Sequence, residues 1–354
     1  MSLDGQDPGG ISHRNPVASF WKNPKFWLGM ALSALFLWLA ARGVEWSEVV
    51  ANSRDANYGL VALGASLMVL AWAVSALRWR ILLSRDASVP WSDTFSAVLI
   101  GFFGNLIFPL RLGDATRIGL ISLKHRLNFG FTLATGVLDK LLDVITLVVL
   151  AGIVTTSIAA PEMAVRAIQS ATAVAALAVA TLVVLAVSRN GVVWLEAMLS
   201  KVVPKRFTGR LLMTAEMFVR GLQSLKDWRQ MVKVGSLSLV VWGISIVGNT
   251  VYLAAFDLSV PWQGVVLLIV MTNLGGAVPS SPGGIGVQEW LTMITLSMWV
   301  ADDSEAFAFA VTRHAFNLGV VADLGAAAVL REGVDFSTLQ ADAARLRAKD
   351  VSPG

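Results

Sequence analysis

Cysteine is absent from this sequence of 354 residues, and histidine occurs only three times. Without cysteine the chain has no disulfide framework, no thiolate nucleophile and no cysteine metal site. The three histidines, His13, His125 and His314, are far apart and share no metal-ligand spacing. We therefore expect neither a resident metal nor any other cofactor.

Charge is also scarce, because charged residues make up 15% of the chain and apolar residues 55%. An average soluble domain carries about 25% charged residues. Long uncharged runs recur as well, and together these features predict an all-α polytopic membrane protein. The net charge of +4 comes from basic residues beside apolar runs, so it indicates membrane topology rather than a nucleic-acid surface.

Six runs of about 20 apolar residues are long enough to cross a bilayer as helices. They are Phe26–Val44, Tyr58–Leu77, Phe131–Ser157, Ala164–Val187, Val232–Phe256 and Ala306–Leu330. The first is interpreted as an anchor helix, because its leader is long for a cleaved signal peptide. The predicted membrane domain spans residues 26–331, between a disordered cytoplasmic tail (1–25) and a second cytoplasmic tail (332–354). Residues 189–230 are expected to form an amphipathic cytoplasmic connector, with a plain connecting helix as the alternative.

Two further apolar regions, residues 94–123 and 264–300, are broken near their middles by proline and glycine. Each arm has at most about 15 residues, or about 22 Å of helix, which falls short of a hydrocarbon core of about 30 Å. We therefore expect two re-entrant helical hairpins. The residues expected at the breaks are Asn105, Pro109 and Gly113, and Asn273, Pro279, Pro282 and Gly286.

The sequence also contains an internal repeat. The tetrapeptide SVPW occurs at Ser88–Trp91 and at Ser259–Trp262, and in each half a proline followed four residues later by glycine marks the break. These matches, at nearly constant separation, predict two copies of span, broken hairpin and span, residues 58–157 and 231–331.

Loop charge predicts that the two copies are inverted. Arg78, Arg80 and Arg85 precede the first hairpin and Lys124 follows it, which places both of its ends in the cytoplasm. Asp257 and further acidic residues after position 300 bracket the second hairpin, which then enters from outside. Both termini are expected in the cytoplasm. Inverted repeats with broken helices are typical of secondary transporters.

Polar residues at the first break suit an anion. Asp114 is expected to cap the returning helix, whose N-terminus would lie beside Arg111 and Arg117. Free N–H groups and two guanidinium groups would bind a phosphate. The alternative is that the arginines only extend to the membrane interface and fix orientation.

The second break carries Ser280, Ser281, Gly283 and Gly284, which offer hydroxyls and close backbone approach. It lacks the Gly-Lys-Ser/Thr ending of a nucleotide-binding loop. Glu289 would lie at membrane depth, where an acidic residue indicates function. The alternative is a carboxylate that stabilises a helix start.

The span after each hairpin is charged as well. Asp139 and Asp143 share one helix face, and Arg313 occupies roughly the place of Asp139 in the second copy. Opposite charges at equivalent places suggest that Asp139 and Arg313 meet, or that each pairs with the opposite hairpin; a structural salt bridge is the alternative. His314 is interpreted as a packing residue, with proton carriage as the alternative.

The motifs GNLIFPLRLGDATR, VLDKLLD and VPSSPGGIGVQE resemble the membrane domain of lysylphosphatidylglycerol synthases, which many stand-alone flippase-like proteins share. The resemblance implies a domain that moves aminoacylated phospholipid between leaflets. Few residues follow the last span, so the synthase activity of a separate soluble domain is not expected here. The positions that match the family motifs are Pro109, Gly113, Asp114, Arg117, Asp139, Asp143, Pro279, Pro282, Gly283, Gly284, Gly286 and Glu289.

The sequence therefore predicts a flippase-like, multi-pass protein of the cell (inner) membrane that moves a phosphate-bearing or anionic phospholipid and is not an enzyme. The alternatives are an ion- or proton-coupled carrier of a small polar solute and a non-transporting accessory subunit of lipid synthesis. An intramembrane enzyme is disfavoured, since no nucleophile–base pair is visible from spacing. The expected partner is membrane lipid and not nucleic acid, and a second copy of the chain or enzymes of lipid biosynthesis remain open as partners.

Overall fold

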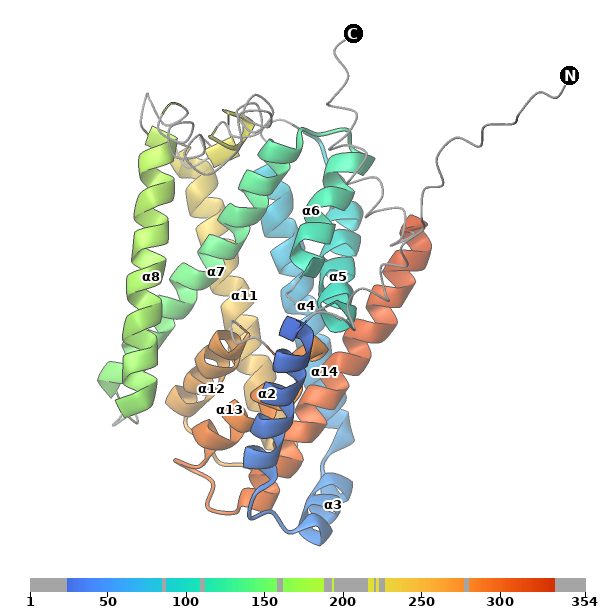
Figure 1. Ribbon diagram of the computed structural model, residues 1–354, viewed down its shortest axis with the longest axis vertical. Coiled ribbons are helices and arrows are strands. Elements are labelled where there is room, and N and C mark those ends of the chain that lie inside the picture. Colours follow the sequence, from blue (N-terminus) through green and yellow to red (C-terminus); the bar gives the residue numbers. More distant parts are fainter. Residues whose placement is uncertain are drawn as a thin grey trace, which may run out of the picture.

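The computed structural model describes residues 24–84, 87–108, 112–157, 162–187, 193, 216–219, 221–222, 227–276 and 280–334. All regular elements in these ranges are helices (Figure 1). They are α2 (Pro24–Ala41), α3 (Trp46–Asp55), α4 (Tyr58–Leu83), α5 (Trp91–Ile107), α6 (Leu112–Lys124), α7 (Phe129–Ser157), α8 (Glu162–Val187), α11 (Trp228–Ala254), α12 (Trp262–Gly275), the 3₁₀ turn η3 (Pro282–Gly284), α13 (Val287–Leu296) and α14 (Asp303–Glu332). Nearly all of the predicted connector and most of both tails lie outside the described residues.

Each predicted span overlaps one described helix, but length and composition alone support fewer membrane crossings. Two of the described helices, α4 and α11, are long and apolar enough to cross a membrane. A third crossing arises if α2 and α3, which meet at a bend of 85°, count as one span. Six full spans therefore remain a prediction.

Helix α3 lies between the first two predicted spans, where no helix was expected. The chain turns at Gly43, whose φ of 89° favours glycine, and then forms α3. Val49 is buried, the Trp46 ring meets the Phe307 ring edge-on at 5.7 Å, and Glu45 N–H donates to Ser304 Oγ at 3.1 Å. These contacts hold α3 against the start of α14.

The duplicated SVPW motif begins equivalent helices. Pro90 and Pro261 occupy the N-cap positions with extended backbone, and α5 and α12 begin at the tryptophans that follow. Proline suits this place, because it cannot donate a backbone hydrogen bond inside a helix. The repeat found in the sequence thus corresponds to a repeated start of the two helix pairs.

The first broken region forms the pair α5 and α6, which lie unusually close together. The Gly113 N–H donates to Asn105 Oδ1 at 2.9 Å, and a side chain at Gly113 would overlap the Gly101 carbonyl oxygen. Asn105 and Gly113 therefore hold the two arms together at the break.

The second broken region forms α12, the turn η3 and α13. Asn273 does not repeat the role of Asn105, because its Nδ2 donates to Ile269 O within its own helix at 2.8 Å. Instead, Gly283, Gly284 and Gly286 all have positive φ and reverse the chain. Figure 1 shows this pair in the lower half of the molecule and α5–α6 in the upper half.

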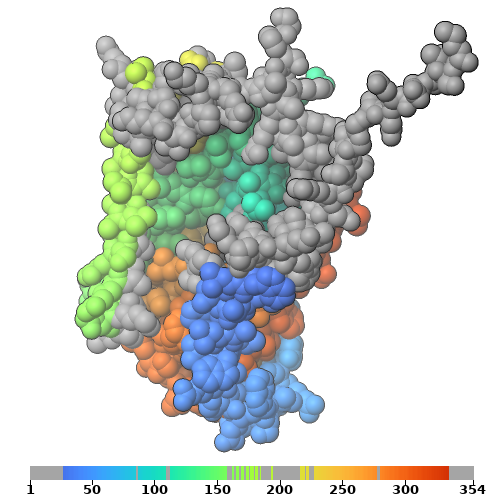
Figure 2. All heavy atoms as spheres, viewed as in Figure 1, coloured from blue at the N-terminus to red at the C-terminus, as the bar shows by residue number. Residues whose placement is uncertain are grey.

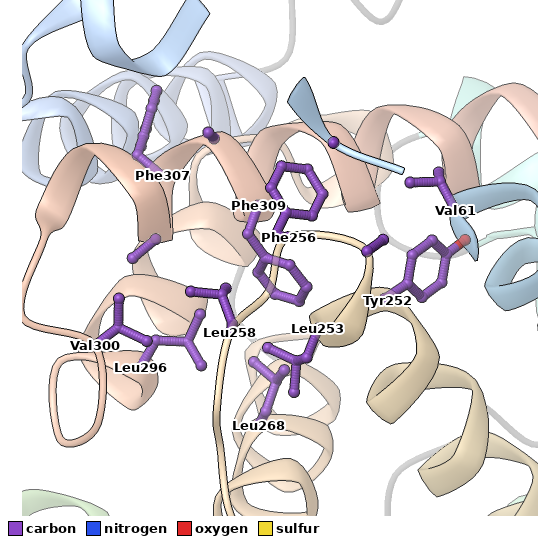
Figure 3. Close-up of a cluster of buried hydrophobic side chains, with 14 of the residues drawn as sticks. Val61, Tyr252, Leu253, Phe256, Leu258, Leu268, Leu296, Val300, Phe307 and Phe309 are labelled. Atoms are coloured by element: carbon purple, nitrogen blue, oxygen red, sulfur yellow. The ribbon is translucent and has the colours of Figure 1, made fainter. Parts of the chain in front are cut away.

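Helices of the two halves pack on each other. Helix α4 lies along α11, α5 packs on α14, and α12 packs on α7. The side-by-side approach of α4 and α11 places Gly64 against the Tyr252 ring. One hydrophobic cluster joins the end of α11 to α12, α13 and α14 (Figure 3), where the Phe256 and Phe309 rings meet edge-on at 5.7 Å.

Candidate functional site

The first polar cluster, here the arginine–aspartate cluster, consists of Arg78, Arg117, Asp139 and Asp143. The fully buried Arg78 of α4 donates from Nε to Asp139 Oδ1 at 2.9 Å and from Nη2 to Asp143 Oδ1 at 2.8 Å. Its Nη1 donates to Ser238 Oγ of α11 at 2.9 Å. One guanidinium group therefore connects α4, α7 and α11.

Arg117 of α6 reaches the same carboxylate from the hairpin. Both of its Nη atoms lie 3.3 Å from Asp139 Oδ2, and its guanidinium carbon lies 4.8 Å from the centroid of the Trp79 ring. The two guanidinium groups face two carboxylates, so the formal charges of the cluster cancel. Arg117 Nε nevertheless is buried and has no hydrogen-bond partner among the described residues.

Asp114 and Lys140 cover this cluster from outside. Asp114 Oδ1 lies 3.6 Å from both Arg117 Nε and Lys140 Nζ, and both side chains are partly exposed. Helix α6 begins at Leu112, so Asp114 lies inside the first turn rather than at the cap position. It still favours the helix start electrostatically.

The second polar cluster, here the glutamate–histidine cluster, consists of Glu289, Arg313 and His314. Glu289 Oε1 lies 2.5 Å from His314 Nδ1, and Oε2 accepts from the Gly286 N–H at 2.6 Å. His314 Nε2 lies 3.1 Å from the Gly283 carbonyl oxygen. The pair thus bonds to both sides of the glycine turn. These contacts are consistent with a functional role of Glu289 and equally with the alternative, a carboxylate that stabilises a helix start.

Arg313 has only neutral partners. It is 8% exposed, donates from Nη1 to Asn249 Oδ1 at 2.9 Å and from Nη2 to Thr292 Oγ1 at 3.3 Å, and lies over the Phe309 ring at 5.8 Å. No carboxylate of the described residues forms a salt bridge with it, and its buried Nε has no hydrogen-bond partner there. The expected meeting of Asp139 and Arg313 is wrong, because Arg78 and Arg117 occupy the Asp139 carboxylate.

The residues of the second break are mostly structural in this conformation. The Ser281 N–H donates to Ser33 Oγ of α2 at 2.7 Å, and Ser280 Oγ is 3.5 Å from the Ser281 carbonyl oxygen. Gly286 has φ 87°, and a side chain there would overlap the Ser33 carbonyl oxygen. Pro282 begins η3. Arg111, Pro109 and Pro279 lie outside the described residues.

Four polar residues of these clusters were missed in the sequence: Arg78, Ser238, Asn249 and Thr292. Arg78 was assigned to a loop with Arg80, but α4 continues to Leu83 and buries it. Its position inside an apolar helical run was the available signal. The other three are neutral residues without a motif. Among the residues described, no group of three or more His, Asp or Glu side chains could hold a metal ion.

A third charged group lies at the far end of α5, α6 and α14. Lys124 Nζ lies 3.1 Å from Asp93 Oδ2 and 2.6 Å from Glu332 Oε2, and His125 Nε2 lies 3.0 Å from Asp93 Oδ2. Burial alone would lower the pKa of Lys124, but hydrogen bonds to Glu332 and Asp93 raise it above its ordinary value. These contacts tie the open end of the first hairpin to the end of α14.

Comparison with known proteins extends these observations. Residues 26–325 match the family model of the lysylphosphatidylglycerol synthase TM region. The chain is also 28% identical over 362 residues to a protein named glycosyltransferase AglD from Haloferax volcanii. The matched region covers 91% of this chain but only 57% of that relative. No solved structure matches significantly. Because the family model covers most of the chain and the described helices are apolar, the protein is a membrane protein that belongs to the family of the lysylphosphatidylglycerol synthase transmembrane region.

Proposed function

We propose that this protein moves a phosphate-bearing or anionic lipid between the leaflets of the membrane. One observation carries the proposal: the buried Nε of Arg313 has neither a hydrogen-bond nor an ion-pair partner in the described part of the chain, whereas the Nε of Arg117 lies 3.6 Å from Asp114 Oδ1. A buried donor left unpaired costs about 1–3 kcal/mol, and more when it is charged. A phosphate oxygen would satisfy such a donor.

The two arginines are not equivalent as anion sites. Arg117 already faces Asp139, whereas Arg313 has Asn249 and Thr292 as neutral partners. An uncompensated guanidinium inside a membrane protein is costly and is typical of a substrate pathway. Arg313 therefore is the stronger candidate for holding the anionic headgroup, and Arg117 the candidate for a second position.

The packing supports the predicted inverted repeat and alternating access between the two re-entrant hairpins. Each helix pair packs on the last long helix of the other half, α5 on α14 and α12 on α7, while α4 and α11 lie together between them. Figure 1 shows the two pairs in opposite halves of the molecule. Such an arrangement lets one half rock against the other around a site near the middle. We propose six spans and cytoplasmic termini in the inner membrane for this transporter.

A hollow on one face suits the acyl chains. Figure 2 shows it beside α8 and above α2, with α7 on its floor and the α5–α6 part of the chain on its right side. Exposed apolar side chains follow α7: Val144, Ile145, Val149 and Ile153. The tails would remain along α7 in the bilayer while the headgroup passes between the hairpins.

The named relative widens the range of cargo beyond aminoacylated phospholipid. Its name includes glycosyl transfer, so anionic lipids that carry a sugar are included as candidates. We propose transport of the lipid by this chain rather than synthesis, with lipid-synthesising enzymes as its suppliers.

Lipid transfer in proteoliposomes tests the proposal. Fluorescently labelled phosphatidylglycerol is expected to cross the bilayer faster than labelled phosphatidylcholine, and Arg313→Gln is expected to slow it about tenfold or more, since a charged hydrogen bond of about 1.5–3 kcal/mol is lost. Arg80→Gln is the matched control, because Arg80 is exposed and donates to Val89 O. Equal rates for the wild type and Arg313→Gln would refute the site, and no transfer by the wild type would refute the function.

A further inference from the structure

His314 lies between two hydrogen-bond acceptors. Its Nε2 is 3.1 Å from the Gly283 carbonyl oxygen and its Nδ1 is 2.5 Å from Glu289 Oε1. Both side chains are buried, with 8% of His314 and 5% of Glu289 exposed. A carbonyl oxygen only accepts, so Nε2 carries a hydrogen atom.

The second contact requires one more proton. If Nδ1 is bare and Glu289 ionised, two lone pairs face each other at 2.5 Å. A proton on either atom turns this repulsion into a short charge-assisted hydrogen bond. Glu289 and His314 therefore hold one shared proton between Oε1 and Nδ1, and with it the pair is neutral. When that proton leaves for the aqueous phase, the pair becomes negative and one of the two histidine contacts must break.

The shared proton stabilises the glycine turn at the second break. His314 donates from Nε2 to the Gly283 carbonyl oxygen, and Glu289 accepts from the Gly286 N–H. The pair therefore holds both ends of the turn against α14. The turn has three glycines with positive φ, among them Gly284. Loss of one of these contacts frees a segment whose backbone meets little steric resistance.

Arg313 connects this proton to the cargo. It precedes His314 on α14, and its Nη2 donates to Thr292, one helical turn from Glu289 on α13. While the pair is neutral, Arg313 is an uncompensated cation that can hold an anion. Once the pair has lost its proton, the Glu289 carboxylate competes for Arg313.

We infer that the Glu289–His314 pair is a proton-binding site that couples lipid movement to proton uptake, with the proton and the anionic headgroup binding together. This rests on the proposed function and adds its energy source. The other elements packed on the pair bring no competing charge. There is no titratable group in α12, in the described side chains of α2 or in the last turns of α5. Helix α11 contributes Tyr252, whose hydroxyl donates to Asn317. Arg313 is the one charged neighbour in this described environment.

The protonation state of His314 can be measured without any transport. The chain has three histidines, so ¹⁵N-histidine spectra of the protein in nanodiscs are simple, and His314→Gln assigns the signal. Both His314 nitrogens are expected to show hydrogen-bonded N–H character at low pH, and one to lose it as the pH rises. In Glu289→Gln one nitrogen is expected to lack a proton at every pH, because the amide donates to it. A wild-type His314 signal that stays the same between about pH 5 and pH 9 overturns the inference while leaving the proposed function intact.

Binding of dihexanoyl-phosphatidylglycerol tests the coupling. If one proton enters with each lipid, the affinity of the wild type falls by up to about tenfold per pH unit above the pH at which the free protein releases its proton. Glu289→Gln is expected to bind equally well at all pH values, because the pair is permanently neutral. His125→Gln is the matched control with the wild-type slope, since His125 contacts Asp93 at the other end of the hairpin.

The outcomes separate the two proposals. An equal pH slope in the wild type and Glu289→Gln refutes the proton coupling, whatever the rate of lipid transfer. Proton-linked binding of inorganic phosphate without binding of the lipid supports the proton site and refutes the lipid as cargo. Proton-linked binding of the lipid supports both.

Discussion

Replacing Asp139 by asparagine should be the most destabilising single change in the arginine–aspartate cluster. Asp139 is 1% exposed, and its two carboxylate oxygens face two guanidinium groups, Oδ1 towards Arg78 and Oδ2 towards Arg117. The amide keeps the shape of the side chain but leaves the two buried guanidinium groups with weaker partners, Asp143 for Arg78 and the partly exposed Asp114, 3.6 Å away, for Arg117. Breaking a buried ion pair from one side costs about 3–5 kcal/mol.

The loss of stability caused by each substitution should follow the contacts that the replaced side chain makes in the cluster. Asp143 has a single contact with Arg78, and its side chain is 22% exposed. Asp143→Asn should therefore cost less, about 1–2 kcal/mol after allowance for solvent screening. Ser238→Ala removes one neutral acceptor and should cost about 1 kcal/mol. The expected order of destabilisation is Asp139, then Asp143, then Ser238.

Thermal unfolding in nanodiscs, followed by tryptophan fluorescence, measures this order. The double variant Asp139→Asn/Arg117→Gln removes one charge of each sign. Its loss of stability should therefore be smaller than the sum of the losses in the two single variants, as a double-mutant cycle shows for residues in direct contact. If Asp143→Asn destabilises the protein as much as Asp139→Asn, or if the double variant shows additive losses, then Asp139 does not bridge the two arginines and the geometry of the cluster is wrong.

Two further changes probe the second break and the open end of the first hairpin. Gly286→Ala should destabilise the protein by at least about 2 kcal/mol, because φ is 87° and the new methyl group would meet the Ser33 carbonyl oxygen; a melting temperature equal to the wild type would contradict this. Lys124→Gln should cost at most about 1 kcal/mol, because the side chain is 36% exposed. The raised pKa of Lys124, beside Glu332 and Asp93, means that its contribution is complete below the ordinary lysine pKa and is lost as the pH rises through the folded value. Melting curves of wild type and variant should therefore converge in alkaline buffer, and a constant difference would refute this assignment.

Much of the fold was predictable because proline, glycine and apolar runs act locally. The two broken regions, the described glycines and Pro282 at their breaks, and the duplicated SVPW each lie at an observed helix end, start or turn. Helix α3 was missed because its sequence, WSEVVANSRD, is polar and lies between two apolar runs. It is held by contacts with α14 that lie far away in sequence, which no local pattern shows.

The site was predictable from the motifs and the repeat, but its pairing was not. Arg117, Asp139 and Glu289 from the motifs and Arg313 from the repeat do lie in buried polar clusters, but the expected pair of Asp139 and Arg313 is wrong. Equivalent positions in two repeats suggested a pair between Asp139 and Arg313. The packing of α4 instead places Arg78 in contact with Asp139. A sequence repeat gives the equivalence of positions and does not give the rotation of a helix about its axis, which decides the partners.

The two clusters therefore have different physical roles, although the sequence repeat predicts equivalent positions for Asp139 and Arg313. The formal charges of the first cluster cancel, and Arg78 connects three helices, so any change there removes scaffold contacts and should reduce stability and transport together. Arg313 has neutral partners, so Arg313→Gln leaves no buried charge behind and should reduce anion binding with little loss of stability. Measuring melting temperature and lipid transfer on Arg78→Gln and Arg313→Gln separates these roles. Equal loss of stability in both variants would show that Arg313 is a structural residue and that the anion site lies elsewhere.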